Sequence, residues 1–151
     1  MIKIISLSVL TLLISYSVIA QDSIIKMESK YTVRETADRF ETIAKEKGLN
    51  IFARINHQEN AASVNMELRP TEVIIFGNPK VGTPLMQCAQ EVAIDLPQKI
   101  LIYEDENQLV WLSYNNPDYL KKRHNIKGCD AILSKIGDVL SKLSAATVES
   151  P

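Results

Sequence analysis

Histidine and cysteine are scarce, with two of each among the 151 residues. His57 and His124 lie far apart in the chain, and neither has a second ligand in the HxxxH or CxxC arrangement typical of zinc sites. The GxSxG motif of serine hydrolases is also missing. The sequence therefore predicts no metal, no cofactor and no catalytic residue.

An excess of charge of one sign is missing as well. The 17 basic residues are balanced by 18 acidic ones, and the longest basic run is "KKR", from Lys121 to Arg123. A nucleic-acid-binding protein usually concentrates positive charge on one face or in one segment. The balance therefore predicts no nucleic-acid partner.

Long apolar runs are confined to the first 20 residues, "MIKIISLSVLTLLISYSVIA". Lys3 precedes an apolar run over residues 4–14, and Val18 and Ala20 stand at the −3 and −1 positions of a cleavage site. This pattern predicts a signal peptide cut after Ala20, a periplasmic or secreted protein, and no membrane contact after cleavage. An uncleaved anchor is the alternative, but the polar residues in the run do not favour it.

The two cysteines, Cys88 and Cys129, permit one disulfide in an oxidising compartment. Their spacing does not decide between that disulfide and two unpaired, small apolar side chains.

The remaining chain fits a single domain, residues 21–143, followed by a flexible C-terminal tail, residues 144–151. Thr32 and Glu35 form a capping-box pattern that starts a helix, and Gly48 ends it. Strands are expected at 23–29, 49–55 and 72–76, with Leu49, Ile51, Ala53 and Ile55 alternating onto one face of the second.

The second half predicts a hairpin and two helices. "KILIYE" and "LVWLSY" flank the turn "DENQ", Asn116 and Pro117 can start a helix, and an apolar stripe from Ile132 to Leu143 marks the last helix. This order of elements predicts an α+β fold, a two-layer sandwich. It has one mixed or antiparallel sheet of about five strands with helices packed on one face.

One loop concentrates glycine and proline in a chain with only five glycines. It lies in "IFGNPKVGTPLMQ", residues 75–87, where Thr83 is the expected N-cap and Pro84 the first helical residue. Free N–H groups at such a helix start attract anions, whereas plain turn geometry with positive φ at the glycines is the alternative. The predicted ligand site comprises His57, Gly77, Asn78, Lys80, Gly82 and Thr83.

Two long segments resemble one known family. "GLNIFARINHQENAASVNMELRPTEVIIFGNPKVGTPLMQ" and "AIDLPQKILIYEDENQLVWLSYNNPDYLKKRH" are similar to domain-of-unknown-function family 302 over roughly residues 32–126. The resemblance implies a compact α+β domain, similar to folds that pair as homodimers, and no established activity. Asn56 stands where the family often has Asp. The family pattern singles out these residues: His57, Arg69, Gly77, Asn78, Pro79, Lys80, Gly82, Thr83, Pro84, Tyr114 and His124.

Three functional hypotheses follow. The first is a non-enzymatic module that binds a small molecule, an anion or a protein partner. The second is an enzyme in which His57, Lys80 and His124 share one cleft. The third is a metal or redox protein that uses Cys88 and Cys129 with the histidines.

Overall fold

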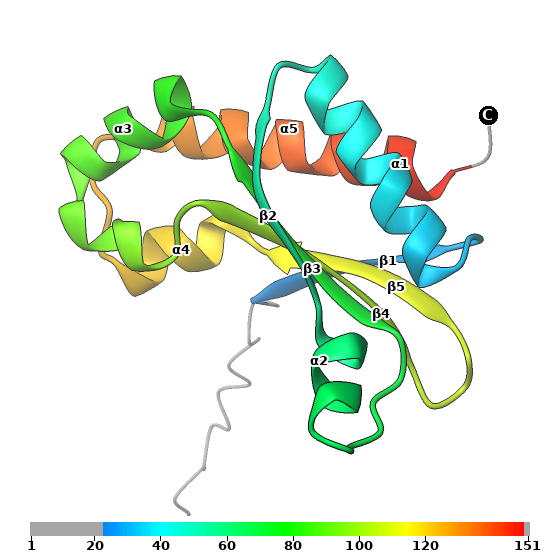
Figure 1. Ribbon diagram of the computed structural model, residues 1–151. Coiled ribbons are helices and arrows are strands. Elements are labelled where there is room, and N and C mark those ends of the chain that lie inside the picture. The colour runs from blue at the N-terminus through cyan, green and yellow to red at the C-terminus, as the bar shows by residue number, and fades with distance from the viewer. Residues whose placement is uncertain (1–22, 150–151) are drawn as a thin grey trace, which may run out of the picture.

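A single antiparallel sheet organises the structure, a computed structural model that describes residues 23–149 (Figure 1). The strand order is β1-β5-β4-β3-β2. The strands are β1 Ile24–Ser29, β2 Asn50–Asn56, β3 Thr71–Gly77, β4 Gln98–Glu104 and β5 Val110–Asn115. The helices are α1 Val33–Glu46, α2 His57–Ser63, α3 Pro79–Cys88, the short 3₁₀ helix η1 Gln90–Ile94, α4 Pro117–Arg123 and α5 Asp130–Val148. The predicted α+β class is confirmed.

The core lies between the sheet and the two long helices, α1 and α5, which Figure 1 shows on the same side of the sheet. Alternate residues of the central strands, among them Ile74, Ile100 and Leu112, are fully buried beneath these helices. Phe40 of α1 meets Phe76 of β3 edge to face, with ring centroids 4.9 Å apart. Burial of these apolar side chains is the main term that holds the two layers together.

The ends of α1 confirm the predicted local signals. Thr32 is the N-cap, its hydroxyl accepts the Glu35 N–H, and the Glu35 carboxylate accepts the Thr32 N–H. Gly48 follows the C-cap with φ +73°, a conformation that glycine adopts without strain.

A bulge in β2 overturns the predicted alternation of that strand. Ile51 pairs with Phe76 on the core side, but the register then shifts, so Ala53 pairs with Ile75 on the opposite face. Arg54 consequently takes a core-side position. The sequence pattern could not reveal the extra residue because apolar and small residues occur on both sides of it.

The predicted flexible tail is wrong for residues 144–148, which continue α5. Thr147 and Val148 are buried against the rest of the protein. The Arg39 guanidinium donates hydrogen bonds of 2.8 Å to the carbonyl oxygens of Thr147 and Glu149, and its Cζ atom lies 4.2 Å from the centroid of the Tyr31 ring. These partners satisfy carbonyls that a helix end leaves free.

The second face of the sheet exposes apolar side chains. Across it, Val73 pairs with Leu101, Leu101 with Ser113, and Ser113 with Lys26. Leu101 is 37% exposed, and Ile24 at the start of β1 is 47% exposed. Within residues 23–149 no helix has the length and apolar content to cross a membrane. The predicted signal peptide lies outside the described residues.

Candidate functional site

The loop that drew attention in the sequence is the first half of helix α3. Asn78, and not Thr83, is the N-cap, and Pro79, and not Pro84, is the first helical residue. Pro84 lies inside the helix. Neither Gly77 nor Gly82 has positive φ. The prediction that this segment turns into a helix is therefore confirmed, but the predicted start is wrong, because the helix begins more than one turn earlier.

The backbone donors at this helix start are already engaged. The Asn78 Oδ1 atom accepts the Lys80 N–H at 2.9 Å, while the Asn78 carbonyl accepts the N–H groups of Val81 and Gly82 at 2.9 and 3.0 Å. The N–H groups of Lys80, Val81 and Gly82, which the expected anion site would use, are thus not free, and the ligand site itself stays a prediction. Lys80 and Thr83 are exposed, and Lys80 lines none of the cavities described below.

Two cavities lie on either side of the start of α3. The larger, called the α5 pocket below, has a volume of about 490 Å³ and lies between α1, α5 and the end of β3. The smaller, about 380 Å³, lies between α3, η1 and the start of β4 and includes Thr83 and Gly82. Both have mainly apolar walls and the size of small-molecule sites. The two cavities share Gly77, Asn78, Val81, Gln98 and Ile136.

Gln98 is the unusual polar side chain of this region. It is the first residue of β4, is only 9% exposed, and lines both cavities. Its Nε2 atom is buried and has no hydrogen-bond partner among residues 23–149. Buried amide groups are nearly always paired, because leaving one unpaired costs about 1–3 kcal/mol. Because Gln98 lines both cavities, its unpaired donor is a candidate partner for a ligand oxygen.

The rim of the α5 pocket is positively charged. Lys47 at the C-cap of α1 and Lys135 and Lys142 of α5 all line it and are all exposed. No acidic residue of the described chain lines the pocket. Its walls are formed by these apolar residues: Ile43, Leu49, Phe76, Val81, Ile136, Val139, Leu140 and Leu143.

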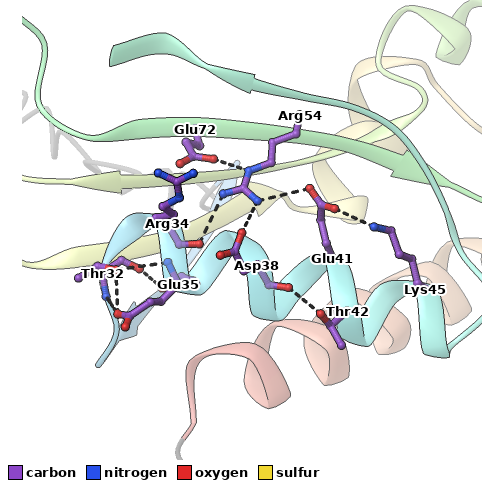
Figure 2. A network of polar contacts seen from close by, with 10 residues as sticks. Thr32, Arg34, Glu35, Asp38, Glu41, Thr42, Lys45, Arg54 and Glu72 are labelled. Carbon is purple, nitrogen blue, oxygen red and sulfur yellow. Dashed lines mark hydrogen bonds and ion pairs between the residues drawn. The ribbon is translucent and has the colours of Figure 1, made fainter. Parts of the chain in front are cut away.

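A separate polar network surrounds Arg54 on the opposite side of α1 (Figure 2). Its guanidinium lies 2.5 Å from the carboxylates of both Glu72 and Asp38, and 3.5 Å from Glu41. Burial alone would lower the pKa of Arg54, but the hydrogen bonds that its guanidinium donates to Glu72 and Asp38 outweigh burial and raise the pKa. The network connects β2 to β3 and to α1. Its charged groups pair with one another, so we interpret its role as structural.

His57 lies far from Lys80. His57 is the exposed first residue of α2, next to Asn56, which pairs with Glu72, whereas Lys80 follows the other end of β3 at Gly77. A strand of this length spans roughly 20 Å. The shared cleft required by the enzyme hypothesis is therefore contradicted.

His124 has a structural partner at the end of α4. Its Nε2 atom lies 2.5 Å from Asp95 Oδ2, and the Arg123 guanidinium lies 3.5 Å from the same oxygen. The imidazole is 7% exposed. This pair fastens α4 to the turn before β4, and it lines neither of the two cavities.

The cysteines are joined in a disulfide between Cys88, the last residue of α3, and Cys129, the N-cap of α5. Their Cα atoms are 6.4 Å apart. This pairing decides the question that spacing left open and removes both sulfurs from any joint site with the histidines. In the part of the chain that the structure describes, no three His, Cys, Asp or Glu residues are grouped to hold a metal ion.

Sequence reasoning missed Gln98 and the three rim lysines. Gln98 occupies the same face of β4 as Ile100 and Ile102, so a polar residue at an inward position was the available signal. The lysines carried no such signal, because helices α1 and α5 are brought together only by the tertiary fold.

The comparisons with known proteins agree on a family and a fold. The family model described as "Domain of unknown function DUF302" matches residues 25–143. A crystal structure of an "uncharacterized conserved protein DUF302" from Bacillus stearothermophilus superposes with a TM-score of 0.67, covering 83% of this chain and 95% of that one. At 20% sequence identity this similarity establishes the fold.

Two curated relatives are more similar in sequence. "Fluoride-specific ion channel FluC 1" of Brucella suis and the protein of the same name in Brucella abortus are each 41% identical over 108 residues. The match covers 72% of this chain, but only 42% and 40% of those proteins. The chain thus spans about two fifths of the length of these relatives.

Proposed function

We propose a function on the premise that this chain belongs to the family described as "Domain of unknown function DUF302". That description assigns no function, so the proposal is based on the geometry of the site. The function is non-enzymatic binding of a small, largely apolar molecule in the α5 pocket. The observation that carries this proposal is the buried amide of Gln98, a residue that lines the pocket and whose Nε2 atom has no hydrogen-bond partner in the described chain.

The residues of the pocket favour binding over catalysis. A general acid–base needs a titratable group close to the reacting atoms, most often His, Asp or Glu. The pocket is lined by apolar side chains, two side-chain amides and three rim lysines, and the histidines lie elsewhere. An apolar cavity with a few placed polar groups is the common form of a small-molecule site.

An exported location is part of the proposal. The disulfide between Cys88 and Cys129 supports it, because disulfides persist in oxidising compartments and are rare in the cytosol. The sequence pattern over residues 1–20 supports it independently. Thiol alkylation of the cellular protein, with and without prior reduction, measures the fraction oxidised. A fully reduced protein in the native host would contradict the proposed location.

The names of the Brucella relatives raise fluoride as an alternative ligand. Taking a small anion out of water costs several kcal/mol even in a relaxed protein interior. An apolar pocket with one unpaired neutral amide offers little to offset that cost. Fluoride titrations of the protein are therefore expected to leave its melting temperature unchanged at low millimolar concentration.

The binding proposal is tested with the neutral apolar fluorophore N-phenyl-1-naphthylamine. Ala146 is exposed at the pocket lining, so Ala146→Trp places a large ring in the α5 pocket. Ala131 is exposed on the same helix, away from the pocket, so Ala131→Trp is the matched control. We expect saturable binding that Ala146→Trp weakens by about ten-fold or more, which is about 1.4 kcal/mol, and that Ala131→Trp leaves unchanged. Absence of saturable binding, or equal effects of the two variants, would refute the proposal.

A further inference from the structure

The α5 pocket carries positive charge at its mouth and apolar side chains in its walls. We propose that its ligand is an amphiphilic anion, a single apolar chain with one negatively charged head group. The inference rests on the proposed binding function and goes further by assigning the chemical class of the ligand. The apolar chain occupies the pocket, and the head group stays at the rim.

The rim lysines have the right placement to receive the head group. Lys135 and Lys142 are seven residues apart on α5, which places them about two turns apart on one face of the helix. Lys47 faces them from the end of α1. None of the three takes part in an ion pair within residues 23–149, unlike Lys45 and Lys121, which pair with Glu41 and Asp130.

The charge balance at the pocket is uneven although the chain as a whole is nearly neutral. Three lysines line the α5 pocket and no acidic residue of the described chain does. The acidic side chains Asp38 and Glu41 of α1 instead form ion pairs with Arg54 and Lys45. An anionic head group at the rim is therefore attracted by the lysines, and a cationic one is repelled.

The interior of the pocket suits an apolar chain better than a charge. Val139, between the two α5 lysines, is 37% exposed although it is apolar, and Leu140 and Leu143 lie deeper and are buried. A carboxylate inside the pocket would lose its hydrating water, and the only polar group to replace that water would be one neutral amide. The head group therefore stays where water and the lysine side chains reach it, while methylenes fill the interior.

The test measures displacement of N-phenyl-1-naphthylamine by chains that differ only in the head group. Dodecanoate, 1-dodecanol and dodecyltrimethylammonium are compared below their micelle concentrations, together with decanoate. We expect dodecanoate to bind about ten-fold more tightly than 1-dodecanol at low salt, since exposed charge pairs are each worth a few-fold. The ammonium compound binds most weakly. Lengthening decanoate to dodecanoate raises affinity about four-fold per methylene.

Charge variants separate the rim from the net charge of the protein. Lys135→Gln combined with Lys142→Gln leaves only Lys47 at the rim and is expected to reduce the preference for dodecanoate over 1-dodecanol from about ten-fold to about two-fold, without weakening the binding of 1-dodecanol. Lys122→Gln combined with Lys127→Gln removes the same charge from exposed positions outside the α5 pocket and keeps the preference.

The possible outcomes distinguish the two proposals. Equal binding of dodecanoate and 1-dodecanol, or a preference unaffected by the Lys135 and Lys142 changes, overturns the anionic ligand class and leaves the pocket as a neutral apolar site. If none of the four compounds displaces the fluorophore from the wild-type protein, both the binding proposal and the ligand class are refuted.

Discussion

Gln98 is a residue at which stability and the proposed binding function have opposite requirements. A methionine of similar length would fill the same space on the core side of β4 without an amide to satisfy. The chain instead keeps an unpaired donor in a buried position of its sheet. Residues that lower stability and make no evident stabilising contact are characteristic of functional sites.

Replacing this amide should stabilise the free protein. We expect Gln98→Met to increase the free energy of unfolding by about 1 kcal/mol, because a buried unpaired donor costs about that amount or more. Urea denaturation with a constant m-value measures the change. A loss of stability would mean that the side chain is satisfied in solution. Gln90→Met, at an exposed position of η1, is the control and should have little effect.

Asp105 provides a pH-dependent contribution at the hairpin between β4 and β5. The hydrogen bond from the Trp111 indole, assisted by the N–H groups of Leu109 and Asn107, lowers the pKa of Asp105. Because the folded-state pKa lies below the unfolded value, its stabilising contribution is complete above about pH 4 and is lost as the pH falls through the folded-state pKa.

Asp105→Asn should therefore reduce the steepness of acid unfolding below about pH 4. Fluorescence of Trp111, the single tryptophan, monitors unfolding at each pH. Glu106→Gln removes an exposed carboxylate from the same turn and is the matched control. An identical acid transition in the wild type and Asp105→Asn would show that the indole hydrogen bond does not act in solution.

Single residues predicted the start of α1 correctly but the start of α3 wrongly. Thr32 and Glu35 satisfy each other locally, so their capping box was readable from four positions. At α3 only Thr83–Pro84 was expected to start the helix, and Asn78–Pro79, which has the same N-cap and proline pattern, was overlooked. The helix starts at Asn78–Pro79, where the Asn78 side chain and carbonyl accept three N–H groups.

At the scale of elements, the disulfide couples the two helices that border the pocket region. It joins the end of α3 to the start of α5, and both helices line the two cavities. A link across 41 residues restricts the unfolded chain. In the chain-entropy model this restriction is worth about 4 kcal/mol.

Removing the disulfide should lower stability and loosen the pocket. We expect Cys88→Ala combined with Cys129→Ala to decrease the free energy of unfolding by about 4 kcal/mol. The oxidised wild type, its reduced form and the double variant are compared by urea denaturation. Equal stability of the oxidised and reduced wild type would contradict a structural role for the bond.

Whole elements were predicted where the signal was local and missed where tertiary contacts decide. The β4–β5 hairpin and the apolar stripe of α5 follow from short sequence windows. The bulge after Ile51 and the extension of α5 to Val148 depend on partners far along the chain. Arg39, which holds the end of α5, is over a hundred positions away from it in the sequence.

At the scale of the whole molecule, the two faces of the sheet differ. One is covered by α1 and α5, and the other leaves Leu101 and Ile24 in contact with solvent. The homodimer implied by the sequence resemblance stays a prediction. The second face, with the cross-strand row from Val73 through Leu101 to Lys26, is where we expect two copies to pair.

Sedimentation velocity tests this expectation. Leu101→Glu places a charge in the middle of the second face and should shift a dimer to the mass of a monomer. Ile94→Glu introduces the same change in η1, where the side chain is 73% exposed, and should leave the mass unchanged. A wild-type protein that sediments as a monomer at high micromolar concentration would contradict the predicted homodimer.

From the strand order we expect a particular order of events in folding. β2, β3, β4 and β5 are each adjacent to the next along the chain, so they can assemble as a meander from nearby segments. β1 must wait for β5, because Ile24 pairs with Asn115, a residue far along the chain from it. Closing so long a loop is slow compared with local pairing. A chain emerging amino end first therefore carries its first strand unpaired until most of the protein has been made.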